Sequence, residues 1–398
     1  MFLDTKRIGR AVISAALLAG IAALPVLAQN AKGVTDKEIR LGIMSAMTGP
    51  VAAYGIAMQA GTGALFNLVN DRGGVNGRKI NLVGEDDAMS TPMAIGVARK
   101  MVSGDGIFAL VNSGGTPQID ALRPYLIDQN NVSIYGSYGG LLDWYAPPKK
   151  GLYGIPVVAE DQARTLGRLA AKEGRKKLLV LHIEAASFER GAKEVETGYR
   201  SFSSSGTVEL LGVKLPTTDY APIVIKISQI KPDALVVMVQ ENETVLLAKE
   251  LQNQNIKLPM YAWTPSVSLK VLELGGSAVE GLKAVSWTAS PTDDTPSVRE
   301  YRAALAKYFP SEKPDFVSLY TFGASKVFAE ALSRMKGPIT SEELQKAMYS
   351  LKSFETGILP PVTFSPERHL GSSDLYPAEV IKGKWQMGPP LDSVNLKW

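Results

Sequence analysis

Three stretches combine residue types that could bind or transform a small molecule. They read NSGGTPQ at Asn112–Gln118, YGSYGG at Tyr135–Gly140 and GIMSAMTGPVAAYG at Gly42–Gly55. In the first, Gly114 and Gly115 let backbone N–H groups converge, and Thr116 adds a hydroxyl where a helix begins. Because converging N–H groups and the positive end of a helix favour an anion, this stretch indicates a site for a small carboxylate.

A phosphate loop is the first alternative. Gly42–Gly55 contains no G-x-x-x-x-G-K-[ST], and GTGALF from Gly61 fails G-x-G-x-x-G at its last position. Nucleotide binding is therefore disfavoured. Gly61 and Gly63 are interpreted as small residues that allow a helix to pack closely on a sheet.

A nucleophile loop is the second alternative. YGSYG places Tyr135 where G-x-S-x-G requires a glycine. The chain has two histidines, of which His182 ends a buried strand and His369 lies in a loop rich in proline and glycine. We expect no enzyme. The rival is a secreted hydrolase with a nucleophile beside one of these histidines, and replacing both without loss of activity would exclude it.

Asp86 and Asp87 could bind a metal ion or act in acid–base chemistry. They fall between a strand end and a helix start, where carboxylates accept otherwise unpaired N–H groups. The absence of cysteine and the presence of only two histidines disfavour a metal site. We therefore expect these carboxylates to accept backbone N–H bonds, and we expect no metal or other cofactor.

Strands and helices alternate along the first part of the chain. The expected strands are Ile39–Met44, Ile80–Val83, Ile107–Val111 and Val132–Tyr135. The expected helices are Ala57–Asn70, Thr91–Val102 and Pro117–Gln129. Alternation at these intervals predicts βαβ units and a parallel sheet.

A second series of strands and helices follows. Its expected strands are Lys177–His182, Val208–Lys214, Ala234–Val239 and Met260–Trp263, and its helices are Asp161–Glu173, Arg190–Ser203, Tyr220–Lys231 and Thr244–Gln254. The apolar run DALVVMV indicates a strand buried on both faces. Three helices come next, at Val298–Tyr308, Asp315–Met335 and Ser341–Ser350, and Tyr376–Gln386 is expected to be a strand pair. Ser341 and Glu343 resemble a capping box.

The pattern predicts two α/β lobes of similar build. The helices after Pro296 come too late to belong only to the second lobe, so the chain must cross between the lobes more than once. Crossings are predicted at Gly154–Val157, Ser286–Pro291 and Gly357–Pro366, where Gly or Pro lies near a change of lobe. The predicted lobes are residues 36–155 with 288–360, and residues 156–287 with 361–398. Ligands of open α/β sheets bind at the carboxyl ends of the strands, so we expect the ligand in the cleft between the lobes.

The first 28 residues differ in composition from the rest of the chain. Lys6, Arg7 and Arg10 precede the uncharged run Ala11–Leu24, and Pro25–Ala28 ends in a small residue. This pattern indicates a signal peptide, residues 1–28, although the stretch Ala11–Ala28 also has the minimum length of a membrane anchor. Without this leader, 40 basic and 38 acidic residues remain, which favours neither nucleic acid nor an anionic membrane as a partner. With no cysteine to carry a lipid, we expect a soluble monomer outside the inner membrane.

Six aromatic residues fall at or near the predicted turns from strand to helix. They are Tyr54, Tyr138, Trp144, Phe188, Trp263 and Trp287. Each alone is typical of ordinary packing. Together they favour an apolar, aromatic-lined cleft between the lobes.

The chain from Glu38 to about Val380 resembles the type I periplasmic solute-binding proteins of ABC importers, in the leucine/isoleucine/valine-binding branch. The resemblance rests on IRLGIMSAMTGPVAAYG, FNLVNDRGGVNGRKINLVGEDDAMSTPMAIGVARKMV and IKPDALVVMV, in this order and at the family's distances. It implies two Rossmann-like lobes, joined by three hinge crossovers, that close on one small ligand without catalysis. It also implies a periplasmic location and delivery of the ligand to an inner-membrane ABC permease. A sensory module on the same fold is the rival interpretation.

The resemblance also implies a set of ligand contacts. Those on the first lobe fall on Tyr54, Ser113, Gly115, Thr116, Ser137, Tyr138 and Gly140. Those on the second lobe fall on Phe188, Gln240, Glu241 and Thr264. Thr116 is placed at the ligand carboxylate, and Tyr54 is placed over the ligand.

Three positions depart from the family's amino-acid binders. Thr264 stands where they carry the carboxylate that holds the ligand ammonium, Phe188 replaces a tyrosine, and Met89 replaces a cysteine of a disulfide loop. A buried ammonium without a carboxylate would be desolvated and would lack a charge-assisted bond, although Glu241 could substitute. We therefore expect a small organic acid without an ammonium, aromatic or α-keto. The alternative ligand is a branched-chain or other apolar amino acid.

Overall fold

The computed structural model describes residues 30–49, 51–104, 106–138, 140–145, 147–155 and 158–391. The predicted signal peptide, residues 1–28, lies outside this part of the chain. Within these ranges, no helix is both long enough and apolar enough to cross a membrane.

The first lobe is built on a parallel sheet of five strands in the order β2-β1-β3-β4-β5. The strands are β1 (Glu38–Ser45), β2 (Lys79–Asp86), β3 (Ala109–Val111), β4 (Ser133–Tyr135) and β5 (Leu152–Tyr153). The helices between them are α1 (Ala52–Asp71), α2 (Thr91–Val102), α3 (Thr116–Arg123) and α4 (Leu142–Tyr145). The predicted helix Pro117–Gln129 is divided at Pro124, where a π-helical turn begins, because proline lacks the N–H that would continue α3 regularly.

The second lobe is built on seven strands in the order β12-β11-β10-β9-β8-β6-β7. Its strands are β6 (Lys177–Ile183), β7 (Thr207–Val213), β8 (Ala234–Met238), β9 (Met260–Ala262), β10 (Lys283–Ser286), β11 (Tyr376–Ile381) and β12 (Lys384–Met387). The pairings of β11 with β10 and with β12 are antiparallel, and the other pairings in this sheet are parallel. Its helices are α5 (Ala159–Lys172), α6 (Ala186–Arg200), α7 (Ala221–Ile230), α8 (Glu241–Asn253) and α9 (Leu269–Gly275). Every residue of β8 is buried, as the run DALVVMV predicts.

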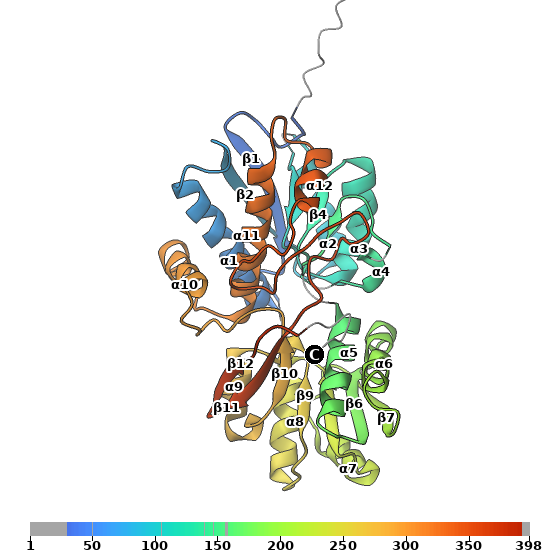
Figure 1. Cartoon of the computed structure of the whole chain (residues 1–398). Helices are drawn as coiled ribbons and strands as arrows, with labels where there is room; N and C mark the ends of the chain where they lie inside the picture. Colours follow the sequence, from blue (N-terminus) through green and yellow to red (C-terminus); the bar gives the residue numbers. More distant parts are fainter. Residues whose placement is uncertain are drawn as a thin grey trace, which may run out of the picture.

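Three helices return the chain to the first lobe after β10 (Figure 1). They are α10 (Pro296–Tyr308), α11 (Phe316–Arg334) and α12 (Ser341–Tyr349), and α10 and α11 pack on α1. The chain then enters the second sheet again at β11, so it passes three times between the sheets. Gly154 forms a parallel bridge with Leu370, which places the first and third crossings side by side. The third crossing follows Leu370, later than Gly357–Pro366, because Phe364 still donates its N–H to Leu351 beside α12.

The contact between α1 and α11 depends on Gly61. A Cβ built on Gly61 would lie 2.1 Å from the carbonyl oxygen of Ser318, and one on Gly63 would lie 2.6 Å from the ring of Phe309. Both glycines therefore leave room for neighbouring helices, Gly61 for α11 and Gly63 for the end of α10. The prediction that they pack a helix on a sheet is wrong. The sequence indicated that small residues are needed here, but it did not indicate which element packs against them.

Several element boundaries also differ from prediction. α1 begins at Ala52, which places Tyr54 in its first turn, and α8 begins at Glu241. The strand β10 and the helices α4 and α9 were not predicted, because they are short or lack a clear apolar period. The N-cap of α12 is Thr340, whose hydroxyl accepts the N–H of Glu343, so the cap lies one residue before Ser341.

Candidate ligand-binding site

Two of the predicted turns meet at the carboxyl ends of the first sheet. Gly114 and Tyr138 form a parallel bridge, and the N–H of Tyr138 donates to the carbonyl of Ser113 at 2.9 Å. The Ser113 hydroxyl accepts the N–H of Met44 at 2.9 Å and donates to Val111. Ser113 is buried, so its side chain joins strand ends and does not face a ligand.

Gly115 and Thr116 form the start of α3. Gly115 has φ of 82°, and a Cβ built on it would lie 1.9 Å from Oε1 of Gln118, so this turn requires glycine. Thr116 is half-buried, and its hydroxyl makes no hydrogen bond to any described residue. The hydroxyl and the turn beside it are therefore available to an anion. Ser137 is buried, and Gly140 lies against Trp144 and Tyr145.

An aromatic group lies beside this turn. Tyr138 makes edge-to-face contacts with Tyr54, Trp287 and Tyr320, with ring centroids 6.2, 5.2 and 5.7 Å apart. Tyr320, on α11, was missed by sequence reasoning because nothing local marks a helix residue as part of a distant cluster. Trp144 does not join this group: it is buried in a separate core and contacts Tyr145.

The tyrosines of this group can donate hydrogen bonds. Within the described residues, the hydroxyls of Tyr54 and Tyr138 make none. Burial, with smaller contributions from nearby charges, raises the pKa of both phenols, so they stay neutral at physiological pH. Among those charges are the carboxylates of Glu241 and Asp315.

The polar ligand contacts predicted on the second lobe make bonds to other residues of that lobe. Glu241 pairs with Lys270 at 2.9 Å and accepts the hydroxyl of Ser268 at 2.8 Å. Thr264 donates its hydroxyl to the carbonyl of Val285 at 3.0 Å. Gln240 precedes α8, and its carbonyl accepts the N–H and the hydroxyl of Thr244.

Phe188 lies edge to face with Trp263, with ring centroids 5.8 Å apart. Of the predicted second-lobe contacts, Phe188 alone adds apolar surface. The side chains of Glu241 and Thr264 each have a polar partner within the second lobe, whereas the bonds of Gln240 are made by its backbone carbonyl.

Asp315 is a charged residue that sequence reasoning did not select. It is the N-cap of α11 and accepts the N–H of Ser318 at 2.8 Å. Burial raises the pKa of its carboxyl. The next residue, Phe316, is 6% exposed and belongs to the apolar core of the second lobe, so the start of α11 connects the two lobes. Asp315 begins the predicted helix Asp315–Met335, but the contact of this end of the helix with the second lobe was not predicted.

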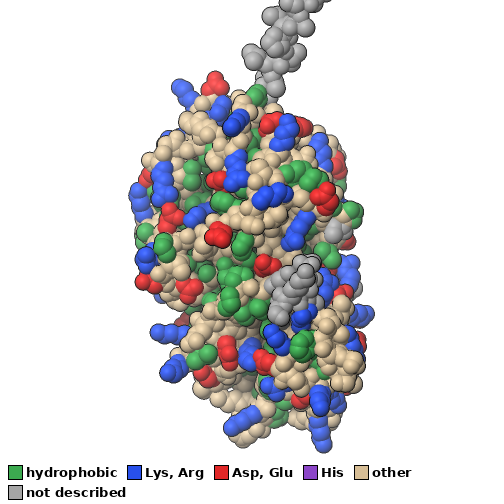
Figure 2. Space-filling view, in the orientation of Figure 1, with side chains coloured by type: hydrophobic (Ala, Val, Ile, Leu, Met, Phe, Trp, Pro, Cys, Tyr) green, Lys and Arg blue, Asp and Glu red, His purple; other side chains and the backbone are tan. Residues whose placement is uncertain are grey.

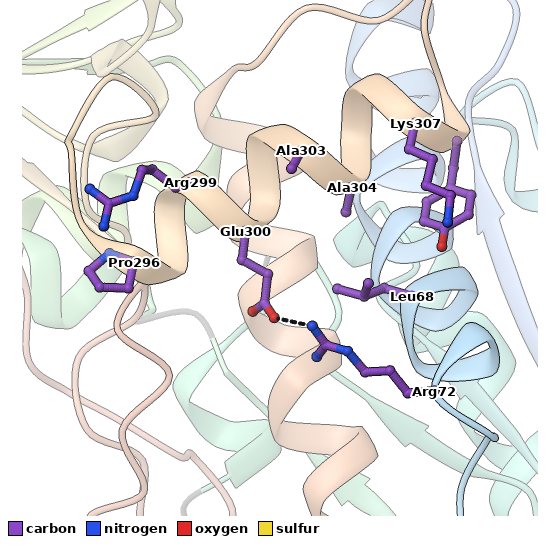
Figure 3. Close-up of a pocket in the computed structure, with 9 residues that line it drawn as sticks. Leu68, Arg72, Pro296, Arg299, Glu300, Ala303, Ala304 and Lys307 are labelled. Atoms are coloured by element: carbon purple, nitrogen blue, oxygen red, sulfur yellow. Dashed lines mark hydrogen bonds and ion pairs between the residues drawn. The ribbon is translucent and has the colours of Figure 1, made fainter.

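A cavity of about 500 Å³ lies away from the aromatic group, between α1 and α10 (Figure 3). Its floor is apolar, and Arg72 pairs with Glu300 across it at 2.9 Å. Lys307 at its end pairs with Asp71. Because these charges are already compensated, we place the candidate site at the aromatic group, although a cavity of only about 10 Å³ adjoins Trp287 and Tyr320 there.

The residues considered for metal or catalytic chemistry have structural partners. Asp86 accepts N–H groups from Met47 and Ala88, and Asp87 accepts that of Met89. They accept backbone N–H groups as predicted, but from turns and not from the first turn of α2. In the described part of the chain, no group of three or more His, Asp or Glu is placed to hold a metal ion.

The two histidines also have partners. His369 contacts the hydroxyl of Tyr349 through Nε2 at 2.7 Å, and its Nδ1 faces two backbone carbonyls. Burial lowers the pKa of His369. His182 places Nδ1 2.9 Å from the carbonyl oxygen of Ile183. No nucleophilic side chain is hydrogen-bonded to either ring among the described residues other than the phenol of Tyr349.

The face of the molecule seen in Figure 2 shows no dominant charge. Figure 2 shows Lys and Arg side chains interspersed with Asp and Glu over the visible face of both lobes. This mixture agrees with the near balance of acidic and basic residues in the sequence.

Comparisons with known proteins agree with this architecture. Leu/Ile/Val-binding protein homolog 1 of Brucella abortus (strain 2308) is 27% identical over 349 residues, which cover 85% of this chain and 89% of the relative. A fatty acid ABC transporter substrate-binding protein from Thermomonospora curvata superposes with a TM-score of 0.80 at 20% identity, covering 93% of this chain and 96% of that one. A branched chain amino acid ABC transporter from Thermus thermophilus with bound valine gives a TM-score of 0.80 at 17% identity, over 92% and 99% of the chains.

These structural similarities confirm the predicted fold of two α/β lobes. The family model described as periplasmic binding protein matches residues 38–384, which is most of the chain. That family binds solutes and is not enzymatic, as the sequence predicts. The chain therefore belongs to the periplasmic binding protein family.

Proposed function

We propose that this protein captures a small carboxylate between its lobes and delivers it to an inner-membrane ABC permease. The observation that carries the proposal is the arrangement at the first sheet. The free hydroxyl of Thr116 lies at the start of α3, next to the turn that bridges to Tyr138, and the hydroxyls of Tyr138 and Tyr54 also lack partners. Donors that are neutral and desolvated bind a carboxylate strongly once water is excluded.

Two contacts favour a ligand without an ammonium group. Thr264 occupies the position at which amino-acid binders are expected to carry a carboxylate, and its hydroxyl is bonded to Val285. The substitute, Glu241, is neutralised by Lys270. An aromatic or α-keto acid accepts hydrogen bonds from the donors of the first lobe. It has no ammonium group, so it does not require an unpaired carboxylate from the protein.

One observation favours the alternative, a branched-chain or other apolar amino acid. Asp315 is half-buried, has no basic partner among the described residues, and acts electrostatically on Tyr54 and Tyr138. A ligand ammonium near these rings would compensate its charge. The Thermus thermophilus structure contains valine, which is also consistent with this alternative.

A thermal-shift screen tests the proposal and separates the two ligands. The panel contains phenylacetate, 4-methyl-2-oxopentanoate, leucine and valine. A ligand at 100 times its Kd should add about 2.7 kcal/mol to the free energy of unfolding, which raises Tm. Stabilisation by leucine with none by an ammonium-free acid would overturn the preferred ligand and leave the amino acid.

The remaining parts of the proposal concern location and assembly. We propose that residues 1–28 are removed on export, that the mature protein is periplasmic, and that it is a monomer. Mass spectrometry of the exported protein and light scattering of the purified protein test these points. An intact leader or a stable dimer would overturn the corresponding part.

A further inference from the structure

Three methionines of the first lobe are exposed beside the ends of β1 and β2. Met47 follows β1 and is 38% exposed, Met89 follows β2 and is 45% exposed, and Met93 in the first turn of α2 is 47% exposed. We name these three residues the methionine rim. The other large hydrophobic residues that are exposed in the described ranges all lie on the second lobe: Phe202, Leu215, Ile225 and Leu274.

Hydrogen bonds link the turns that carry two of these three residues. Oδ1 of Asp86 accepts the N–H of Met47 at 2.8 Å and the N–H of Ala88 at 2.8 Å, so the two turns that carry Met47 and Met89 share one carboxylate. Single exposed apolar side chains are ordinary on a protein surface. Met47 and Met89 differ from such single residues, because the turns that carry them share the Asp86 carboxylate.

The backbone at Met89 has an unusual conformation. Ala88 and Met89 have φ of 48° and 56°, in the left-handed region that residues other than glycine seldom adopt. Asp87 accepts the N–H of Met89 at 3.0 Å, and Gln118 donates to the Met89 carbonyl at 2.7 Å. Left-handed residues persist where the surroundings over-determine them, and they concentrate at ligand sites.

Met89 adjoins the turn proposed to bind the carboxylate. A Cβ built on Gly115 would lie 3.1 Å from Sδ of Met89, and one on Gly114 would lie 3.5 Å from Cε of Met58. The turn that ends at Thr116 therefore runs between a buried and an exposed thioether. Methionine is flexible and polarizable, and it adapts to apolar ligands of varied shape.

We propose that the methionine rim is a ligand subsite, in which Met89 covers the apolar part of a carboxylic acid whose carboxylate lies at Thr116. This inference rests on the proposed function and specifies the ligand further. Met93 lies four residues after Met89 in the first turn of α2, and the turn of Met47 shares Asp86 with the turn of Met89, so the subsite suits an arylalkyl acid with a chain of several methylenes. Continuity with the carboxylate turn is what favours a ligand over a protein partner on this surface.

Calorimetry with phenylacetate, 3-phenylpropanoate and 4-phenylbutanoate tests the subsite. In the native protein, Kd should fall about fourfold for each added methylene, the factor that corresponds to burying one methylene at about 0.8 kcal/mol. Met89→Asn removes the thioether while tolerating left-handed backbone, so it should abolish the gain in affinity that each added methylene gives. Met89→Leu should retain the gain.

The matched control is Ile225→Asn, an exposed apolar residue on α7 of the second lobe, which should change none of the three affinities. Melting curves establish that each variant is folded. Equal gains per methylene in the native protein and in Met89→Asn overturn the subsite and leave the proposed function standing. Binding of leucine with none of the three acids overturns the subsite as well. If no carboxylate binds, the proposed function fails and the subsite with it.

Discussion

Thr116 illustrates how much depends on a single hydroxyl. The hydroxyl of Ser113, three residues earlier, bonds two strand ends, whereas the hydroxyl of Thr116 has no partner among the described residues. Thr116→Val keeps the shape of the side chain but leaves a ligand oxygen without a donor. We expect carboxylate binding to weaken by about 1 to 3 kcal/mol in calorimetry.

The control for this variant is Thr218→Val, at an exposed threonine of the second lobe. It should leave affinity unchanged. Unchanged affinity in Thr116→Val itself would remove Thr116 from the site.

Asp315 gives a prediction about pH. Because burial raises the pKa of its carboxyl above the ordinary value of 3.8, folding favours the protonated form. The stability that this group contributes is present below the ordinary pKa and is lost as pH rises through the raised one. Asp315→Asn keeps a good N-cap for α11 and cannot ionise. Its free energy of unfolding in urea, relative to the native protein, should therefore increase between about pH 4 and about pH 8.

A constant difference over that range would contradict the assignment. The measurement is made without ligand, because a ligand ammonium would compensate the charge of Asp315 and reduce the effect.

The residues also mark where sequence reasoning reaches its limit. The types and order of Tyr54, Thr116 and Tyr138 were sufficient to select them. The sequence did not predict the hydrogen bond from Thr264 to Val285 or the ion pair of Glu241 with Lys270. A hydroxyl or carboxylate bonds to whichever partner the folded chain places beside it. Whether these residues contact a ligand is still a prediction.

At the scale of elements, the packing of α1 on α11 gives a matched pair of substitutions. Gly61→Ala places a Cβ 2.1 Å from the carbonyl oxygen of Ser318, so the helices must separate. Overpacking of this kind costs about 1 to 3 kcal/mol. Gly96→Ala, on the exposed side of α2 with no neighbour within 4 Å, should instead stabilise the protein by about 0.5 to 1 kcal/mol. Urea denaturation measures both, and equal effects would contradict the packing argument.

The long, periodic elements were predictable from the sequence, and the short ones were not. The bounds of α2 were predicted without error, and the strand pair near the C-terminus is present. β10 has only four residues, and it is held as a strand by its pairing with β9 and β11 on either side. No local sequence pattern predicts such pairing. α8 begins at Glu241, before the predicted start at Thr244, because Glu241 and Glu243 form its first turn, where acidic residues favour a helix.

At the scale of the molecule, Phe316 joins the lobes. It is the first residue of α11, which packs on α1, yet its ring is part of the second core. Phe316→Ala should weaken this contact and favour a wider separation of the lobes, seen as a larger radius of gyration by X-ray scattering without ligand. Phe202→Ala, which truncates an exposed ring on the second lobe, is the control. An unchanged radius in Phe316→Ala would show that the ring does not hold the lobes together.

The three passages of the chain between the sheets have a consequence for biosynthesis. The strands β1 to β5 leave the ribosome first, but α11, which covers α1, follows only after β6 to β10 have been made. The second sheet in turn waits for β11 and β12, near the C-terminus. Neither lobe can therefore finish folding as an independent N-terminal unit during translation, and the nascent chain keeps both cores incomplete until nearly all of it has been synthesised.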